Sequence, residues 1–250
     1  FGGTARLASV TEKLVPIMAM CYILGGLYIL ATHAGMIIPA FKMIIQGAFD
    51  PAAATGGVIG VTMKEAIRYG VARGLFANEA GMGSTPHAHA QAKVQHPAEQ
   101  GFVAIMGVFI TTFMIITMTA LIILTTGSLD GVTSGGALTQ KAFTAGLGGF
   151  GSPFVAICIF FFAFSTIIGW YFFAEQNVKY LFGNKPLPIF RCIAMFFIVL
   201  GSTLKLDLVW QLADFFNGIM VIPNLIAVIG LAKVVSNALN DFDEKGQLKA

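Results

Sequence analysis

Residues 67–90 read IRYGVARGLFANEAGMGSTPHAHA, and this stretch decides how the rest of the chain is interpreted. It lies among long apolar runs, yet it carries Arg68, Arg73 and Glu79. In the hydrocarbon core of a bilayer every backbone N–H and C=O must be satisfied internally. A glycine-rich segment at that depth therefore occurs only where it is buried in protein or lines a watery cavity. This pattern indicates a binding site rather than a lipid-facing helix.

The glycines of this stretch predict an interrupted helix. Glycine adopts backbone conformations closed to other residues, and an unwound turn between two half-helices directs free main-chain groups at a bound solute. We expect the break between Asn78 and Gly83, with Asn78, Gly81 and Gly83 as substrate-binding positions. Asn78 suits a zwitterion because its amide both donates and accepts hydrogen bonds.

The composition is that of an integral membrane protein. Of the 250 residues 56% are hydrophobic and only 11% are charged, against roughly 25% charged in soluble domains. No basic patch with interleaved aromatic residues occurs, so we expect no nucleic-acid partner. The three cysteines sit in separate apolar runs and predict neither a disulfide nor a metal site. The chain begins with Phe1 and has no signal-peptide pattern, and we expect it to be a fragment.

Hydropathy and length predict an all-α polytopic protein with about six membrane-crossing helices, one of them discontinuous. The expected crossings are residues 14–32, about 61–90, 101–126, 153–174, 187–204 and 208–231. Residues 36–49 suggest a short surface or re-entrant helix rather than a crossing, residues 127–151 an exposed loop, and residues 237–250 a frayed tail. Pro16 falls in the first turn of the first crossing, where a missing N–H costs nothing.

Lys and Arg residues test the orientation of these crossings. Six crossings place both chain ends on one side, and that side collects nine basic residues: Arg6, Lys13, Lys93, Lys179, Lys185, Arg191, Lys233, Lys245 and Lys249. The other side collects three: Lys42, Lys141 and Lys205. The ratio predicts that both ends are cytoplasmic, provided that the interrupted segment crosses.

Two adjacent hydroxyls at residues 165 and 166 interrupt an otherwise apolar run. The oxygens of Ser165 and Thr166 are hard ligands that suit a cation such as sodium. The structural alternative is a bond from each hydroxyl to a carbonyl of its own helix, which is frequent inside membranes. Both interpretations stay open from the residues alone.

Other polar side chains have both structural and functional interpretations. Glu79 and Arg73 are expected to neutralise each other, since charges within a membrane normally pair; substrate contact is the alternative. We expect Asp214 to bond other helices and Trp210 to lie at the membrane interface. His87, His89 and His96 invite an intramembrane metal enzyme that also uses Glu79. Against it, their spacing fits no zinc pattern, and polar loops between helices often contain histidine.

The run RGLFANEAGMGSTP at residues 73–86 resembles the signature of the alanine or glycine:cation symporter family, the sodium:alanine symporters, which usually reads RGxFSNEAGxGS. Ala77 replaces the usual serine and so removes one hydroxyl. The segments TEKLVPIMA at 11–19 and LADFFNGIMVIPNLIA at 212–227 also resemble this family.

The resemblance implies a leucine-transporter-like symporter fold. Residues 1–250 would form a single, partial transporter domain, with residues 14–32 as the fifth core helix and the rest as the second inverted repeat. The first core helices would be absent. By the same resemblance Ser165 and Thr166 bind sodium, while Thr166 and Trp170 line the substrate.

The function implied is sodium-coupled symport of a small neutral amino acid, alanine or glycine, by alternating access across the plasma membrane. Such a protein moves its substrate without changing its bonds, so we expect a multi-pass transporter with sodium as coupling ion and membrane lipid around it. The residues do not decide between alanine and glycine, between sodium and proton coupling, or between oligomeric states.

Overall fold

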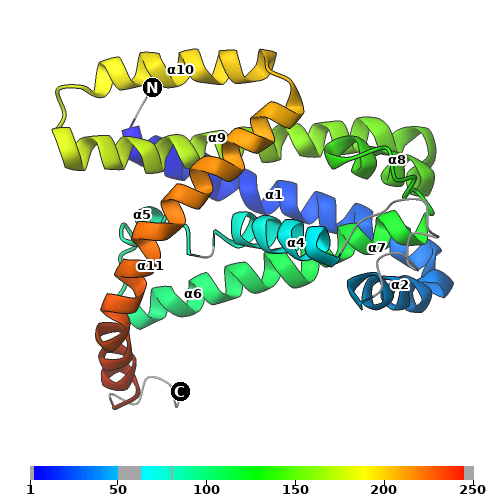
Figure 1. Ribbon diagram of the computed structural model, residues 1–250, viewed down its shortest axis with the longest axis horizontal. Helices are drawn as coiled ribbons and strands as arrows, with labels where there is room; N and C mark the ends of the chain where they lie inside the picture. The colour runs from blue at the N-terminus through cyan, green and yellow to red at the C-terminus, as the bar shows by residue number, and fades with distance from the viewer. Residues whose placement is uncertain (1–2, 50–62, 80, 245–250) are drawn as a thin grey trace. The chain divides into compact units, whose positions relative to one another are not determined.

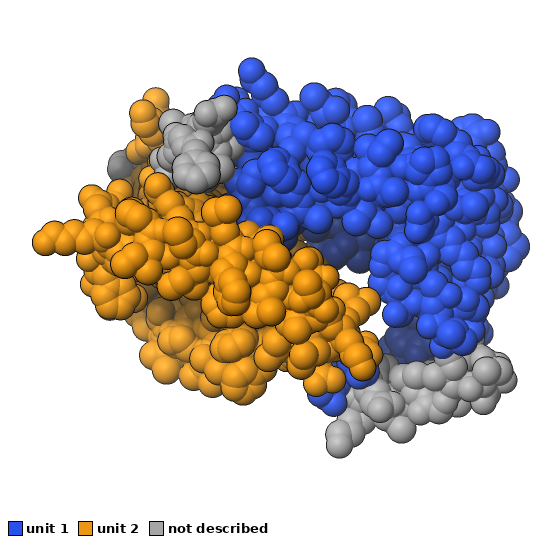
Figure 2. Space-filling view, turned by 90° about the horizontal axis from the view of Figure 1, so that it is seen from above, with its two compact units in different colours: residues 1–71, 109–168 blue, residues 72–108, 169–250 orange. Residues whose placement is uncertain are grey.

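The computed structural model describes residues 3–49, 63–79 and 81–244, and within these ranges it contains helices and no β-strand (Figure 1). The all-α prediction is thereby confirmed. Residues 61 and 62 of the expected interrupted span and residues 245–250 of the expected tail lie outside the described residues. The chain divides into two compact units, one of residues 1–71 and 109–168 and the other of residues 72–108 and 169–250 (Figure 2).

Several helices are suited to a membrane. By length and composition four stretches of the described chain could cross one: Ser9–Thr32, Pro97–Thr125, Gly135–Phe182 and Leu206–Glu244. Two shorter apolar helices cover Ala34–Phe49 and Leu187–Thr203. These lengths support an integral membrane protein, because about 20 apolar residues span the hydrocarbon core. The total of six crossings stays a prediction.

The first unit contains the apolar core. Its described helices are α1 (Gly3–Thr32), a 3-10 helix (Ala34–Met36), α2 (Ile37–Phe49), the first part of α4 (Met63–Asn78), a π-helical turn (Ile110–Ile116), α7 (Thr117–Thr125), α8 (Gly135–Leu147), a second 3-10 helix (Gly148–Phe150) and the first part of α9 (Gly151–Phe182). The buried cluster comprises Tyr22, Ile29, Met118, Ile122, Ala142, Phe143, Val155 and Cys158. Helices α1, α2 and α8 all pack against α7, so α7 is the centre of this unit.

Glycines allow the close approach of these helices. A Cβ on Gly151 would collide with the backbone carbonyl of Phe143, and one on Gly146 would lie 2.6 Å from the side chain of Ile29. Backbone cannot move aside as a flexible side chain can, so Gly151 is the more demanding position. One polar bond crosses the core, where the hydroxyls of Tyr22 and Thr119 lie 2.7 Å apart.

Two sequence predictions in this unit are wrong. Helix α1 begins at Gly3, so Pro16 lies in its interior rather than in its first turn. Residues 127–151 are not simply an exposed loop, because α8 forms within them and buries Ala142 and Phe143. The Gly- and Thr-rich composition concealed a helix that tertiary packing stabilises. Residues 36–49 do form a short helix as predicted, and its position in the membrane stays a prediction.

The second unit contains the end of α4 (Met63–Asn78), α5 (Pro86–His89), most of α6 (Pro97–Phe109), the second part of α9, α10 (Leu187–Thr203) and α11 (Leu206–Glu244). The prediction that the chain is frayed from residue 237 is wrong for residues 237–244, which belong to α11. This helix continues to Glu244, and Phe242 is buried with its ring 5.0 Å from that of His96 and 6.0 Å from that of Phe102.

Candidate functional site

The predicted interruption of the helix is present. Helix α4 ends at Asn78, and the next helix among the described residues begins at Pro86. Of the residues that the structure describes between them, which leave out residue 80, three have positive φ angles: Glu79 at 49°, Gly81 at 77° and Gly83 at 79°. These angles lie outside the right-handed helical region, so the regular ladder of main-chain hydrogen bonds lapses. The second half-helix is shorter than expected, because α5 has only four residues.

The two glycines of the turn have different surroundings. A Cβ on Gly83 would lie 2.7 Å from Oδ1 of Asn224 on α11, whereas one on Gly81 would meet only Leu225 at 3.6 Å. Gly83 therefore combines a left-handed backbone with close packing, and only glycine satisfies both without strain. Met82 between them is 2% exposed, so the turn is anchored in the second unit.

Glu79 bonds within the turn and not to Arg73, so the predicted ion pair between these residues is wrong. The Oε2 atom of Glu79 accepts hydrogen bonds from the hydroxyls of Ser84, at 2.7 Å, and of Thr85. Ser84 is 2% exposed. These bonds close the turn on itself, because they join its first residue to its last two.

Arg73 instead pairs with Asp214 on α11. The two guanidinium nitrogens Nη1 and Nη2 donate to the two carboxylate oxygens at 2.8 and 3.2 Å, which is the bidentate geometry that suits arginine. The expectation that Asp214 bonds another helix is confirmed. The guanidinium carbon also lies 4.2 Å from the ring centroid of Trp210, a cation–π contact. Trp210 thus packs against charged and aromatic groups of α4.

An aromatic stack joins α4 to α9 and α11. The ring of Phe76 lies parallel to that of Trp170, with centroids 6.4 Å apart and an interplanar angle of 11°. The same ring meets Trp210 edge-on at 6.1 Å. Phe76 was not singled out from the sequence. Its spacing of three residues from Arg73 was an available signal, since it places both side chains on one side of a helix.

The proposed substrate positions are therefore partly brought together. Asn78, Gly81 and Gly83 occupy one turn, and Phe76, two residues before Asn78, contacts Trp170. Thr166 lies one helical turn before Trp170 on α9.

Ser165 and Thr166 belong to the first unit. Both hydroxyls donate to the carbonyl of Phe162, at 2.9 and 2.8 Å, as the structural alternative required. Ser165 also lies 3.9 Å from the sulfur of Met18 on α1. Because each hydroxyl acts as donor in these bonds, its oxygen retains lone pairs that can face a cation. The geometry is compatible with both interpretations.

The three histidines have separate partners. His87 places Nδ1 2.8 Å from the carbonyl of Ser84 and Nε2 3.2 Å from Oδ1 of Asn177. His96 Nε2 lies 3.2 Å from Asp241, and His89 Nδ1 lies 2.7 Å from Nε2 of Gln100. Within the described ranges no group of three His, Cys, Asp or Glu side chains could hold a metal. The arrangement offers no support for the metal-enzyme alternative.

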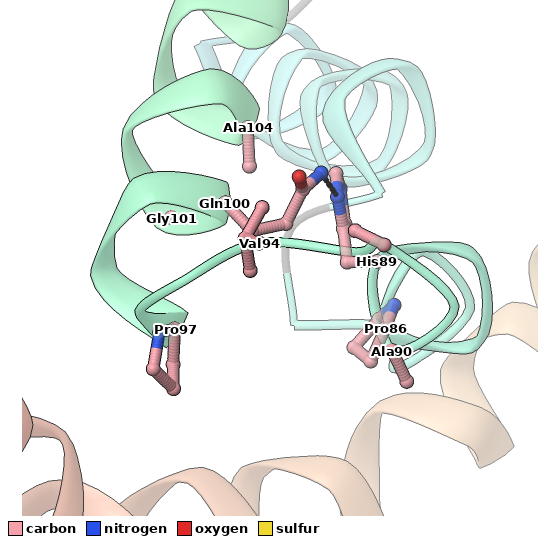
Figure 3. Close-up of a pocket in the computed structure, with 9 residues that line it drawn as sticks. Pro86, His89, Ala90, Val94, Pro97, Gln100, Gly101 and Ala104 are labelled. Carbon is pink, nitrogen blue, oxygen red and sulfur yellow. Dashed lines mark hydrogen bonds between the residues drawn. The ribbon is translucent and has the colours of Figure 1, made fainter.

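A pocket beside His89 has a volume of about 500 Å³. Its lining is Pro86, His89, Ala90, Ala92, Val94, Pro97, Gln100, Gly101 and Ala104. Figure 3 shows Gln100 reaching from α6 toward His89, and this pair supplies the polar atoms of a mostly apolar wall. With its two polar side chains bonded to each other, the pocket presents little for a zwitterion.

The sequence was compared with known proteins. The model of the sodium:alanine symporter family matches residues 1–250. A sodium/alanine symporter of Methanococcus maripaludis, AgcS, is 41% identical over 247 residues, which cover 97% of this chain and 53% of the relative. A probable sodium/glutamine symporter of Bacillus subtilis, GlnT, is 40% identical over 244 residues, covering 97% of this chain and 50% of the relative.

A third relative, the sodium/proton-dependent alanine carrier protein of a Bacillus species, is 37% identical over 264 residues, covering 98% of this chain and 58% of that protein. The chain thus spans about half the length of the curated relatives it matches. The similarity extends over almost all of the chain.

Proposed function

The chain belongs to the sodium:alanine symporter family, and from this membership and the interrupted helix we propose that its protein carries a small neutral amino acid, alanine or glycine, across the plasma membrane together with sodium. The members of this family are transporters and not enzymes, so the protein moves its substrate unchanged. Alternating access, in which the site faces each side of the membrane in turn, is the mechanism that such coupling needs.

The observation that carries the proposal is the end of α4 at Asn78, followed by the turn with positive φ angles. The last carbonyls of a helix have no intrahelical partners and bear partial negative charge, which suits the ammonium group of an amino acid. Main-chain N–H groups of the turn suit its carboxylate. Asn78, Gly81 and Gly83 are the positions that we assign to this contact, with Thr166 and Trp170 beside the substrate side chain.

Sodium is assigned to Ser165 and Thr166. Two adjacent hydroxyl oxygens that donate their own protons to the carbonyl of Phe162 keep lone pairs for a hard cation. Main-chain carbonyls are the usual further ligands where helices are broken. Placing the ion one turn from Trp170 would couple its binding to that of the substrate, since both occupy α9.

The finer architecture belongs to the same proposal. We assign the chain to the second inverted repeat and one preceding helix of a leucine-transporter-like fold, with α4, the turn and α5 as the discontinuous span and both chain ends in the cytoplasm. The nine-to-three distribution of Lys and Arg supports this orientation. The test is to fuse, after residue 250, a reporter enzyme that works only in the periplasm. Activity of this fusion would refute the cytoplasmic placement.

The test uses the complete gene product in proteoliposomes. Alanine uptake driven by an inward sodium gradient should exceed uptake with potassium, and Ser165→Ala combined with Thr166→Ala should remove that sodium dependence. The control is Ser202→Ala with Thr203→Ala on α10. These adjacent hydroxyls also donate to carbonyls of their own helix, at 2.7 Å each.

Three outcomes are informative. Loss of sodium dependence in the first double variant but not in the control supports the ion site. Unchanged sodium dependence in both double variants would mean that Ser165 and Thr166 on α9 do not bind sodium. No accumulation of alanine, glycine or glutamine by the unaltered protein under any sodium or proton gradient would overturn the proposed function itself.

A further inference from the structure

Trp210 on α11 contacts two side chains of α4 that differ in chemistry. The guanidinium of Arg73 lies 4.2 Å from its ring centroid, and the ring of Phe76 meets it edge-on at 6.1 Å. On each helix the two contacting residues lie about one turn apart: Arg73 and Phe76 are separated by three positions, and Trp210 and Asp214 by four. Residues at these spacings share one side of a helix, so α4 and α11 meet along a row of paired side chains.

The charged end of this row is held rigidly. The bidentate pair of Arg73 and Asp214 fixes the plane of the guanidinium, which a single bond would leave free to rotate. Trp210 packs against a group that cannot easily turn away. The indole consequently contacts both a charge that Asp214 holds in place and the ring of Phe76.

The aromatic end reaches the substrate positions. Phe76 stacks on Trp170 at 6.4 Å, and α4 ends two residues later at Asn78. Any displacement of Phe76 would therefore change the surface that Trp170 and the end of α4 present to a substrate side chain. The single ring of Phe76 links this surface to α11, since it contacts Trp170 and Trp210 at once.

We propose that Trp210 is a positioning residue for substrate selection: supported by the ion pair of Arg73 and Asp214, it holds Phe76 against Trp170 and so limits the size of the substrate side chain. The proposal rests on the proposed transport function and on Trp170 as a lining residue. Trp210 itself touches no substrate. A shorter side chain at 210 leaves Phe76 free to move away from Trp170, which enlarges the space beside the α-carbon of the substrate.

A role restricted to stability makes a different prediction. A helix contact that only stabilises the fold would, when weakened, lower the amount of transporter and hence the maximal rate for all substrates alike. Positioning instead changes the ranking of substrates and raises KM for alanine, because the smaller substrate loses its close wall. The ratio between two substrates measured on one preparation is independent of the amount of protein.

The experiment compares Trp210→Leu and Trp210→Phe in the complete gene product. Methionine and leucine compete with labelled alanine for uptake, and the sodium concentration for half-maximal uptake is measured in parallel. For Trp210→Leu we expect the larger amino acids to compete roughly tenfold better relative to alanine, the size of effect that a hydrophobic pocket exerts on one or two methylenes. Trp210→Phe retains an aromatic edge for Phe76 and should restore most of the selectivity, and neither variant should change the sodium requirement.

Phe215→Leu is the matched control, since Phe215 is an aromatic residue of the same helix that is 61% exposed and contacts the neighbouring Phe216. Asp214→Asn tests separately whether the ion pair with Arg73 holds the guanidinium against the indole of Trp210. It keeps the shape of the side chain but removes the charge, and we expect a smaller shift in the same direction.

Substrate ranking identical to that of the unaltered protein in both Trp210→Leu and Asp214→Asn would overturn the proposal. An equal shift in Phe215→Leu would also overturn it, because the effect would then not be specific to position 210. If Trp210→Leu fails to insert, Asp214→Asn carries the decision, and an unaltered substrate ranking in that variant overturns the proposal. Failure of the transport function appears differently, as absence of alanine uptake by the unaltered protein.

Discussion

The two units differ in the interactions that stabilise each of them internally. The first has an apolar core of eight buried residues in contact, with one hydroxyl pair between Tyr22 and Thr119 inside it. In the second the buried hydrophobic residues among those described are Met82 and Phe242. Its helices are joined by the ion pairs Arg73–Asp214 and Arg191–Glu175, by the contact of His96 with Asp241, and by aromatic ring contacts.

This difference in packing suggests that the two units have different roles. Interdigitated apolar packing is dense and tolerates few alternative arrangements, whereas the described contacts of the second unit join individual pairs of polar and aromatic side chains. The end of α4, from Ala72 to Asn78, and the turn after it lie in the second unit. We therefore interpret the first unit as the more densely packed part, which also carries the proposed sodium ligands Ser165 and Thr166, and the second as the part that carries most of the proposed substrate positions. Four changes test this contrast.

Gly151→Ala should have the largest effect. Its Cβ would collide with the backbone carbonyl of Phe143 inside the apolar core, and overpacking of this kind costs about 1–3 kcal/mol or more. We expect a lower thermal midpoint and less folded protein in detergent, measured by fluorescence-detected gel filtration. Gly169→Ala lies on the same helix and meets nothing within 4 Å. If both variants were equally stable, the tight packing of the first unit would not matter.

Gly83→Ala should stop transport while leaving much of the fold intact. Alanine at a φ angle of 79° is strained by about 1–2 kcal/mol, and its methyl group would displace Asn224 on α11. We expect alanine uptake to fall by about tenfold or more, since that strain distorts the proposed binding turn. Gly218→Ala on α11 has open space around it and serves as control. Normal uptake by Gly83→Ala would remove the turn from the mechanism.

Trp170→Phe should change selectivity rather than rate. The smaller ring opens volume beside the proposed substrate side chain, so larger neutral amino acids should compete several-fold better against alanine. Sodium dependence should stay unchanged. Phe160→Leu, an exposed aromatic position on the first part of α9, should leave the ranking as it is. An unaltered ranking in Trp170→Phe would place Trp170 outside the pocket.

Asp130→Asn should have the smallest effect, because Asp130 and its partner Lys141 are exposed and Asp130 lies outside the possible membrane spans. The Lys141 ammonium and then the Thr133 hydroxyl hold the pKa of the Asp130 carboxyl far below its usual range. A depressed pKa in the folded state means that the stabilising contribution is complete above the ordinary value of about 3.9 and is lost as the pH falls through the folded value.

The difference in thermal midpoint between Asp130→Asn and the unaltered protein should thus be constant from about pH 8 to pH 5 and shrink only in more acidic solution. Lys141→Met should move that decline to higher pH, because it removes the main cause of the shift. A difference that already varies near neutral pH would contradict the assigned interactions.

Local chemistry predicted the features that depend on neighbouring residues. The break after Asn78 followed from closely spaced glycines, and two of these adopt the positive φ angles that glycine favours. Errors arose where a partner came from elsewhere. Arg73 was assigned to Glu79, but it pairs with Asp214 on α11, and Glu79 instead accepts from the hydroxyls of Ser84 and Thr85.

Helix α8 was missed for a related reason. Its sequence, rich in glycine and threonine, has low helical propensity, and burial of Ala142 and Phe143 against the core compensates for it. The contacts of Phe76 with Trp170 and Trp210 were not predicted either. The spacing from Arg73 could place Phe76 on the same side of α4, but it could not identify the rings on α9 and α11 that it meets.

The sequence by itself determined the membrane class, the family and the position of the interrupted helix, because hydropathy, a dense motif and glycine dihedral preferences are all local properties. Only the tertiary structure decided that Arg73 pairs with Asp214, 141 residues away, and that Trp210 lies against this pair. A charge within a membrane must find a partner. Which partner it finds depends on the helix that packs beside it, and that is a property of the folded chain.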